Sequence, residues 1–251
     1  MLKTLIQPVL AKFGVGLHRL GAPSSTRRPI GHMRPFLVDL RARSFHPASV
    51  LDVGANRAEW SMECYDCFPE AFFTLIEPQP EMTPHLELFQ RRAIRSRVVA
   101  AGAGPQRGEL VQTIWEDLKG SSFLPPSDPA SLRSGRQRKV PIVTIDSLFA
   151  DSTVPRPDLV KLDIQGFELE ALKGAGTLFG HTELFILEVS LFRFMPGQPM
   201  LSEVVRFMEE RGYQAYDFPG SLRRPKDGAL GQIDIAFARD GGLLRASNAW
   251  D

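Results

Sequence analysis

Residues 49–59 read Ser-Val-Leu-Asp-Val-Gly-Ala-Asn-Arg-Ala-Glu, and this stretch decides the fold class of the chain. An apolar run that ends at a glycine and leads into a helical pattern is typical of a buried strand that turns sharply into a helix. Gly54 lets the backbone turn and approach a ligand closely. The first amides of the following helix, at the positive end of its dipole, are free to face that ligand. The stretch therefore predicts a strand, a tight turn and a helix that form one side of a binding site.

Short apolar runs alternate with helical patterns along the rest of the chain. We expect main strands at residues 49–53, 71–76, 98–101, 158–163 and 183–188, extra strands at 110–115 and 140–145, and a closing antiparallel pair at 213–217 and 232–237. Helices are expected at residues 57–67, around 86–89, and at 167–179 and 201–211. Strands of this length with helices between them predict an α/β fold, in which a mostly parallel sheet is covered by helices on both faces.

Composition excludes several classes of protein. The chain has 251 residues, of which 43% are hydrophobic and 24% are charged, and this balance is enough for a full core. With 21 Gly and 20 Pro the chain falls well short of the bias that marks disorder. A net charge of +1 argues against a general polyanion binder, so we expect no nucleic-acid partner.

The two cysteines, Cys64 and Cys67, lie within a helical pattern with C-x-x-C spacing. A zinc site would need two more Cys or His ligands at matching spacing, and none stands out, so no metal ligands are predicted. A thioredoxin-type motif is the alternative to two reduced thiols on a half-buried helix face, which we favour. Low cysteine use fits a reducing compartment, and we expect a cytoplasmic protein.

The N-terminal part of the chain differs in pattern from the rest. Residues 1–20 form an amphipathic helical pattern that Pro8 interrupts, and a polar linker follows up to residue 35. We therefore divide the chain into an N-terminal helical extension with its linker, residues 1–35, and one domain, residues 36–251. The simplest interpretation is that the extension docks onto the domain. Peripheral contact of residues 1–20 with a membrane surface, or a lid over a pocket, are the alternatives.

Residues that follow the strands are the candidates for ligand binding, because ligands of such sheets bind beyond the carboxyl ends where the strand order reverses. A dinucleotide turn would read Gly-x-Gly-x-x-Gly, and this chain keeps only the first glycine, Gly54. Glu77 follows the second strand, where an acid can accept hydrogen bonds from both hydroxyls of a ribose. A glycine turn with that acid and without a pyrophosphate site favours S-adenosylmethionine over NAD.

We expect residues from four strand ends to surround the cofactor: Asp52, Gly54, Asn56, Glu77, Ala101, Gly102, Asp163 and Gln165.

Several segments resemble the FkbM family of S-adenosylmethionine-dependent methyltransferases. They are residues 50–56 with Ser61, 76–78, 120–123, 143–146, 159–175 and Glu188. The most specific of them is the Lys-x-Asp-x-x-Gly-x-Glu signature at 161–168, and the resemblance extends over roughly residues 48–238. Two positions depart from the family, which commonly has Glu in place of Gln165 and often has Gly in place of Ala58.

The resemblance implies a fold and an activity. The fold is a Rossmann-like class I methyltransferase with a seven-stranded, mostly parallel sheet and an antiparallel final strand. The activity is methylation of a hydroxyl on a sugar, glycan or natural product. An NAD-dependent oxidoreductase and a non-catalytic Rossmann-like binding module are the alternatives. An enzyme that methylates nucleic-acid amines would need an Asn/Asp-Pro-Pro-aromatic turn after the fourth strand, and residues 163–166 do not match it.

Three residues of the signature are candidates for catalysis. Asp163 could orient the amino group of the cofactor or the acceptor hydroxyl, or act as base, and capping of the next helix is its simpler explanation. Glu168 is expected in the first turn of that helix, where the helix dipole alone accounts for an acid. Lys161 lies inside a buried strand and needs a carboxylate partner, for which Glu188 and Asp52 are within reach. For Lys161 we favour a structural ion pair over a catalytic role.

The sequence indicates the residues that recognise the methyl acceptor less clearly than those that bind the cofactor. Basic residues gather at 91–97, 133–139 and 223–226, either as solvated surface or as a site for an anionic acceptor or membrane. Asp146, at the end of an added strand, either helps to close the acceptor pocket or caps a helix.

Overall fold

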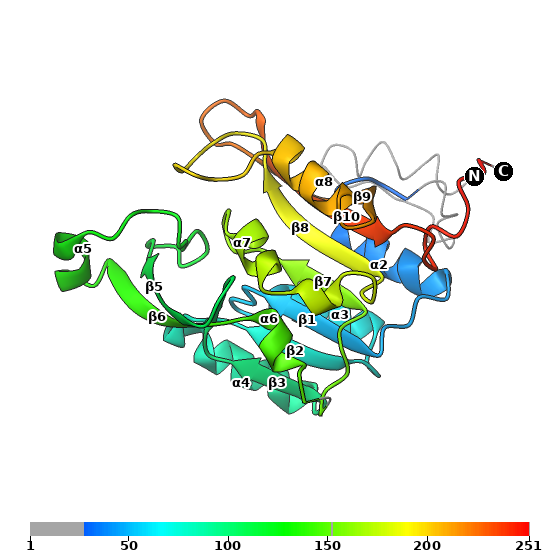
Figure 1. Ribbon diagram of the computed structural model, residues 1–251, viewed down its shortest axis with the longest axis horizontal. Helices are drawn as coiled ribbons and strands as arrows, with labels where there is room; N and C mark the ends of the chain where they lie inside the picture. Colours follow the sequence, from blue (N-terminus) through cyan, green and yellow to red (C-terminus); the bar gives the residue numbers. More distant parts are fainter. Residues whose placement is uncertain (1–27, 152, 251) are drawn as a thin grey trace, which may run out of the picture.

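The computed structural model describes residues 28–151 and 153–250, and a seven-stranded sheet forms its centre (Figure 1). In spatial order its strands are β3 (Ser96–Val99), β2 (Phe72–Ile76), β1 (Ser49–Val53), β7 (Leu159–Leu162), β8 (Leu184–Ser190), β10 (Leu230–Arg239) and β9 (Tyr213–Arg223). The five strands from β3 to β8 are parallel, and β10 is antiparallel to both of its neighbours. The predicted fold class, including the antiparallel final strand, is confirmed.

Helices cover both faces of the sheet, because successive side chains of a strand point to opposite faces. Val50 packs with α2 (Met33–Ala42), α3 (Glu59–Cys67) and α4 (Thr83–Arg92), which follows the short helix η2 (Pro80–Met82). The next residue, Leu51, packs on the other face with α6 (Ile145–Leu148), α7 (Glu168–Lys173), η3 (Gly176–Leu178) and α8 (Leu201–Glu209). Both faces of the central strands are therefore dry, as their nearly continuous apolar sequence requires.

A second, three-stranded sheet extends from the main sheet at the left of Figure 1. It consists of β4 (Gly102–Ala103), β6 (Gln137–Val143) and β5 (Gly108–Thr113), with α5 (Pro129–Arg133) between β5 and β6 in the chain. The extra strands expected at 110–115 and 140–145 thus exist as an antiparallel pair, each beginning two or three residues earlier. The third main strand also ends earlier than expected, and residues 100–103 lead from it into the second sheet.

The helix predicted over 167–179 is wrong in its length. It ends at Lys173 and is followed by the separate turn of η3. Gly174 lies so close to the backbone of Gly104 that a Cβ atom would overlap the Gly104 carbonyl oxygen. This close approach joins the second sheet to α7, and it is the physical reason for the interruption.

The N-terminal predictions are only partly within the described residues. The amphipathic pattern at residues 1–20 lies outside them. The predicted boundary between residues 35 and 36 falls inside α2, whose Phe36, Leu37 and Leu40 are fully buried. Cys64 and Cys67 are free thiols, as predicted, and both are buried. In the part of the chain that the structure describes, no helix is long and apolar enough to cross a membrane.

Candidate functional site

The strand order reverses between β1 and β7, and the carboxyl ends of these two strands lie side by side. The chain passes from β1 to β2 and β3 on one side, then returns to β7 on the other. Val53 pairs with Leu162, so the residues that follow each strand emerge together. A site at such a reversal is the usual place for a ligand in this class of sheet.

The turn after β1 is held by close contact with the turn after β7. Gly54 has a φ of +83°, and a Cβ atom at this position would overlap the carbonyl oxygen of Asp163. The amides of Gly54 and Ala55 donate to the carbonyl of Ile76 at the end of β2, at 2.9 and 3.1 Å. Gly54 is thus required both for its conformation and for the close approach, and the turn predicted from the sequence is confirmed.

Two other residues of this turn also have left-handed backbone. Asn56 has a φ of 45°, and Ala58, which precedes α3, has a φ of 58°. Such a conformation costs an alanine about 1–2 kcal/mol. This explains why glycine suits the position of Ala58 in the FkbM pattern.

Glu77 is buried at the end of β2, with 4% of its surface exposed. One carboxylate oxygen accepts the amide of Asn56 at 2.7 Å, and the other accepts the amide of Gln79 at 2.9 Å. Burial raises the pKa of this carboxyl, although both hydrogen bonds oppose the rise. Glu77 therefore connects the first two strand ends, and its predicted contact with a ribose stays a prediction.

The predicted nucleoside side of the site is nearly filled. Its free volume is about 30 Å³, which is roughly the volume of one water molecule in the liquid. Lys119 and Ser121 line it, and the carbonyl of the preceding Leu118 accepts from the side-chain amides of Asn56 and Gln79 at 2.9 and 3.0 Å. Ser121 donates to Gln79 at 3.0 Å. A nucleoside can enter here only if the segment at 115–122 moves. The lining includes Gly54, Asn56, Glu77, Ala101, Gly102, Asp163 and Gln165, which brings together seven of the eight predicted cofactor residues.

The eighth predicted cofactor residue, Asp52, lies on β1 two residues before Gly54, and 2% of its surface is exposed. Ser61 on α3 donates a hydrogen bond of 2.6 Å to its carboxylate. Burial raises the pKa of Asp52 to about 6, against the opposing effects of Lys161 and Ser61.

Lys161 is 6% exposed and forms a buried ion pair. Its partner is Asp163, at 2.7 Å, and not Glu188 or Asp52 as expected from neighbouring strands. Asp163 directly follows β7 and lies two residues after Lys161, so both side chains point to the same side of the chain. Burial lowers the pKa of Lys161, but Asp163, Asp234 and Asp52 outweigh that effect and leave the pKa above its usual value. Lys161 is therefore an ammonium ion at neutral pH.

Asp163 does not cap the following helix, so that explanation is wrong. The residue before α7 is Phe167, which forms no side-chain cap. Burial raises the pKa of Asp163, but the ammonium of Lys161 and hydrogen bonds from Lys161 and Gln165 lower it below the usual value. Its side chain is 31% exposed, so an ionised carboxylate faces the cavity.

Gln165 connects two carboxylates across the strand ends. Its side-chain amide donates to Asp163 at 3.1 Å and to Glu188 at 2.9 Å, and Gln232 on β10 donates to the same Glu188 oxygen at 2.7 Å. Burial, then repulsion from Asp163, raises the pKa of Glu188 well above its usual value. A glutamate in place of Gln165 would add a further negative charge, so the departure from the FkbM pattern fits its surroundings.

Glu168 supports the turn after β7 and lines none of the site's cavities. It is 2% exposed, and one carboxylate oxygen accepts the amides of Ile164 and Gly166 at 2.9 and 3.2 Å. Burial raises its pKa to about 7. These contacts are those of a residue that positions the turn, and not those of a group that meets a ligand.

Asp146 lies in α6, and its carboxylate accepts from the amide and hydroxyl of Thr177, at 3.0 and 2.6 Å, so it connects α6 with η3. These contacts resemble the capping role that was the alternative for this residue, and its part in closing an acceptor pocket stays a prediction.

Two larger cavities open at the strand ends. A polar cavity of about 470 Å³ borders Asp52, Gly54, Lys161, Asp163 and Glu188. A second cavity of about 460 Å³ shares Gln165, Leu222 and Gln232 with it. Sequence reasoning missed Gln232 and Asp234, although polar residues that alternate with Ile233 and Ile235 were a signal for one inward-facing polar edge. Over residues 28–151 and 153–250, no group of three or more His, Cys, Asp or Glu side chains is placed to hold a metal ion.

Comparisons with known proteins agree with the sequence resemblance. A family model described as the methyltransferase FkbM domain matches residues 52–215. No curated protein matches the chain.

Among solved structures, a methyltransferase FkbM from Methylobacillus flagellatus KT is 20% identical, with a TM-score of 0.49 over 75% of this chain and 43% of that chain. This chain thus spans less than half the length of that structure. A magnesium protoporphyrin IX methyltransferase from Synechocystis PCC 6803 with bound SAM is 12% identical, with a TM-score of 0.49 over 95% and 97% of the two chains.

Replacing Gly54 with alanine tests the contact between the two turns. Gly180 is a matched control, since its φ is also +83° but a Cβ atom there would contact nothing within 4 Å. We expect Gly180→Ala to lower the free energy of unfolding by about 1–2 kcal/mol through backbone strain alone. Gly54→Ala should cost a further 1–3 kcal/mol or so, because the Asp163 backbone must shift. Chemical denaturation measures the free energy of unfolding of both variants. Equal losses would show that a Cβ atom at position 54 does not disturb the Asp163 backbone.

The raised pKa of Glu168 predicts a specific pH dependence. The folded protein holds a proton on Glu168 up to about pH 7, whereas the unfolded chain releases it near the ordinary glutamate pKa of 4.5. The contribution of Glu168 to stability is thus fully present below pH 4.5 and falls as the pH rises to 7, by roughly 3 kcal/mol in all. Glu168→Gln should remove this fall, because its amide oxygen can still accept the turn amides.

Denaturation curves at several pH values check this prediction. Glu170→Gln is the control, because Glu170 lies on the same helix and pairs with Lys173 at the surface. If wild type and Glu168→Gln lose stability in parallel between pH 4.5 and 7, the carboxyl of Glu168 is not the group that titrates.

Proposed function

The chain belongs to the FkbM methyltransferase family, whose model covers 52–215 of its 251 residues, and on this premise we propose that it transfers a methyl group from S-adenosylmethionine to a hydroxyl group of a small molecule or glycan. The single observation that carries the proposal is the excess of carboxyl groups at the polar cavity. Five carboxyl groups line it, Asp52, Glu59, Asp117, Asp163 and Glu188, against three cations, Arg57, Lys119 and the buried Lys161. A sulfonium compound with an ammonium group is the complementary ligand for such a cavity.

The residues at the strand ends fit this cofactor on three further grounds. Gly54 forms the tight turn at the end of β1 and lines the polar cavity. Glu77 provides a carboxylate beside the turn, where it can accept hydrogen bonds from ribose hydroxyls. Asp163 carries an ionised carboxylate that faces the cavity, where a cationic ligand group is favoured. When bound, S-adenosylmethionine supplies an electrophilic methyl group whose leaving sulfur needs no proton.

The remaining chemical requirement is to take a proton from the acceptor hydroxyl. We assign this proton to the carboxylate of Asp163, which is partly exposed to the cavity. Lys161 keeps that carboxylate ionised and correctly placed, and Gln165 holds its other oxygen. Lys161, Gln165 and Glu168 are therefore positioning residues in this proposal, and Asp163 is the catalytic one. Hydroxyl transfer is favoured because a hydroxyl needs a base to take its proton while its oxygen lies in line with the methyl carbon and the sulfur.

Cofactor binding tests this assignment. We expect wild type to bind S-adenosylmethionine in a calorimeter and Glu77→Gln to bind it about 10- to 100-fold more weakly, since a hydrogen bond to a charged group contributes roughly 1.5–3 kcal/mol. Glu81→Gln is the control, because Glu81 lies at the surface and pairs with Arg138. Binding of NAD in place of S-adenosylmethionine would contradict the proposal, as would unchanged affinity in Glu77→Gln.

A further inference from the structure

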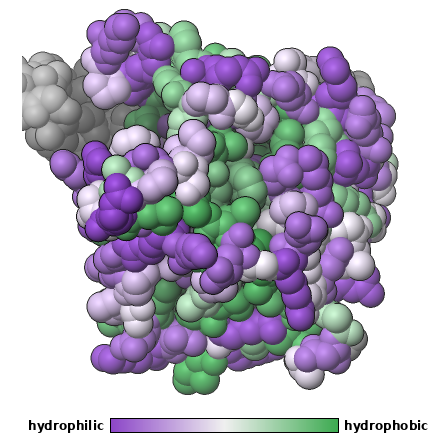
Figure 2. All heavy atoms as spheres, turned by 60° about the vertical axis from the view of Figure 1, so that its left-hand side comes forward, coloured by the Kyte–Doolittle hydropathy of each residue, from purple (hydrophilic) through white to green (hydrophobic). Residues whose placement is uncertain are grey.

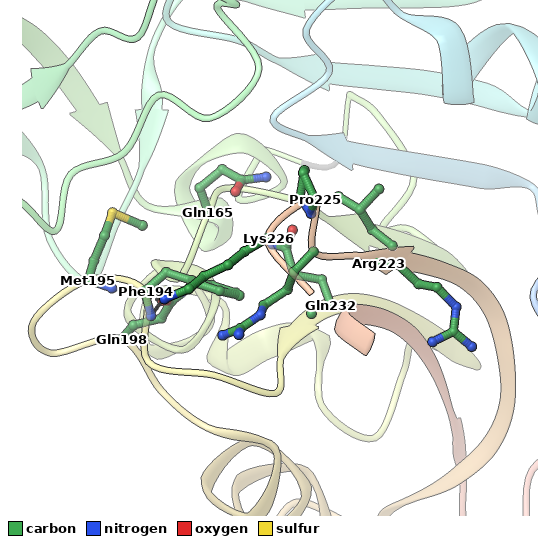
Figure 3. A pocket seen from close by; sticks show the side chains of 11 residues that line it. Gln165, Phe194, Met195, Gln198, Arg223, Pro225, Lys226 and Gln232 are labelled. Atoms are coloured by element: carbon green, nitrogen blue, oxygen red, sulfur yellow. Dashed lines mark hydrogen bonds between the residues drawn. The ribbon is translucent and has the colours of Figure 1, made fainter. Parts of the chain in front are cut away.

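The second cavity lies between two segments that reach beyond the main sheet. One is the loop at residues 191–200, and the other is the hairpin that joins β9 to β10 (Figure 3). Both extend from the side of the molecule on which the parallel strands end (Figure 1). The cavity has a volume of about 460 Å³, which lies in the usual range for small-molecule sites.

The walls of this cavity are mainly apolar. Phe194, Met195, Leu222 and Pro225 line it. Phe194 is 47% exposed and Leu222 is 60% exposed, so large hydrophobic side chains face the solvent here instead of the core. Figure 2 shows the side on which the strands end, with hydrophobic side chains gathered in a hollow that hydrophilic residues surround. Grouped apolar exposure of this kind marks a binding surface.

The loop wall is held in place by a buried amide. Gln198 is 1% exposed, and its side-chain oxygen accepts the amides of Phe194 and Met195 at 3.0 and 3.2 Å. Its side-chain nitrogen donates to Ser190, at the end of β8, at 2.7 Å. The loop is thus built onto the sheet, and Phe194 and Met195 are presented by a fixed backbone.

Arg224 joins the hairpin to the loop, and Lys226 of the hairpin stays available to a ligand. Arg224 pairs with Asp227, and its guanidinium lies 3.9 Å from the centre of the Phe192 ring. Arg223 donates to the Gly228 carbonyl, and its side chain extends away from Phe194 (Figure 3). Lys226 is exposed, lines the cavity and forms no ion pair with any residue that the structure describes.

The two cavities differ in charge. The residues that line the second cavity (the hairpin cavity) include no carboxylate, whereas Asp52, Asp163 and Glu188 border the polar cavity. Gln165, Leu222 and Gln232 border both, so the cavities are adjacent. A positively charged ligand group is therefore favoured in the polar cavity, and an apolar or anionic group is favoured in the hairpin cavity.

We propose that the hairpin cavity binds the methyl acceptor, and that this acceptor is a small amphiphile with an apolar body, a hydroxyl and a carboxylate or phosphate. The inference rests on the proposed methyltransferase function and names its substrate class. The apolar body packs on Phe194 and Leu222, the anion pairs with Lys226, and the hydroxyl reaches past Gln165 toward Asp163. A bare neutral sugar would leave these apolar walls without a partner.

Binding of 12-hydroxydodecanoate, measured by calorimetry, tests the proposal. This probe has a hydroxyl at one end, a carboxylate at the other and an apolar chain between them. We expect it to bind at least about tenfold more tightly than the neutral 1,12-dodecanediol, a difference of roughly 1.4 kcal/mol. Lys226→Gln should reduce this preference to less than threefold. Lys139→Gln, which changes an exposed lysine on β6 away from the cavity, should leave it unchanged.

The apolar wall is tested with the same two probes. Phe194→Ala should weaken both by about tenfold, because a buried aromatic contact contributes at least 1.5 kcal/mol or so. S-adenosylmethionine affinity, measured beside each experiment, separates the two proposals. If the cofactor binds but the probes do not, or if acid and diol bind equally, the acceptor class is wrong and the methyltransferase proposal stands. If a neutral methyl glucoside binds more tightly than both probes, the acceptor class is also wrong. If the probes bind as expected and the cofactor does not, the methyltransferase proposal fails, and with it the role of the cavity as acceptor site.

Discussion

The site depends on an imbalance of buried charge around Lys161. Its ammonium lowers the pKa of Asp52, Asp163, Glu188 and Asp234, while burial raises the pKa of each. One cation cannot neutralise four carboxyls, so the fold keeps protons on some of them and ionises the one that Lys161 contacts directly. The result is a cavity with ionised carboxylate at Asp163, where a positively charged ligand group is favoured.

The backbone at the strand ends makes this cluster possible. Gly54 brings the turn after β1 against the carbonyl of Asp163. The carboxylate of Glu168 holds the turn after β7, because it accepts hydrogen bonds from two backbone amides of that turn. Gln165 then bridges Asp163 and Glu188 with a neutral amide that hydrogen-bonds to both. The same Gln165 marks the border with the hairpin cavity, so one residue lies between the acidic and the apolar halves of the site.

Features that depend on neighbouring residues in the chain could be predicted. The β1 turn, the acid after β2 and a buried lysine on β7 all follow from local pattern, and seven predicted cofactor residues line one cavity. Features that depend on strand register or on loops could not. The neighbouring Asp234 and the Leu118 carbonyl that accepts from Asn56 are brought there by contacts between distant segments. The partner of Lys161 is Asp163, only two residues along the chain, although partners on neighbouring strands were expected. The helix after β7 was predicted too long because the contact of Gly174 with Gly104 is also long-range.

Proton release on cofactor binding tests the charge imbalance most directly. S-adenosylmethionine carries one more positive charge than S-adenosylhomocysteine and otherwise offers nearly the same contacts. Titration of each at pH 6.5, in buffers of different ionisation enthalpy, gives the number of protons exchanged. The account predicts that the sulfonium compound releases more protons, because its extra charge lowers the pKa of carboxyls such as Asp52, which titrates at about 6 in the free protein. Equal proton exchange for the two compounds would contradict it.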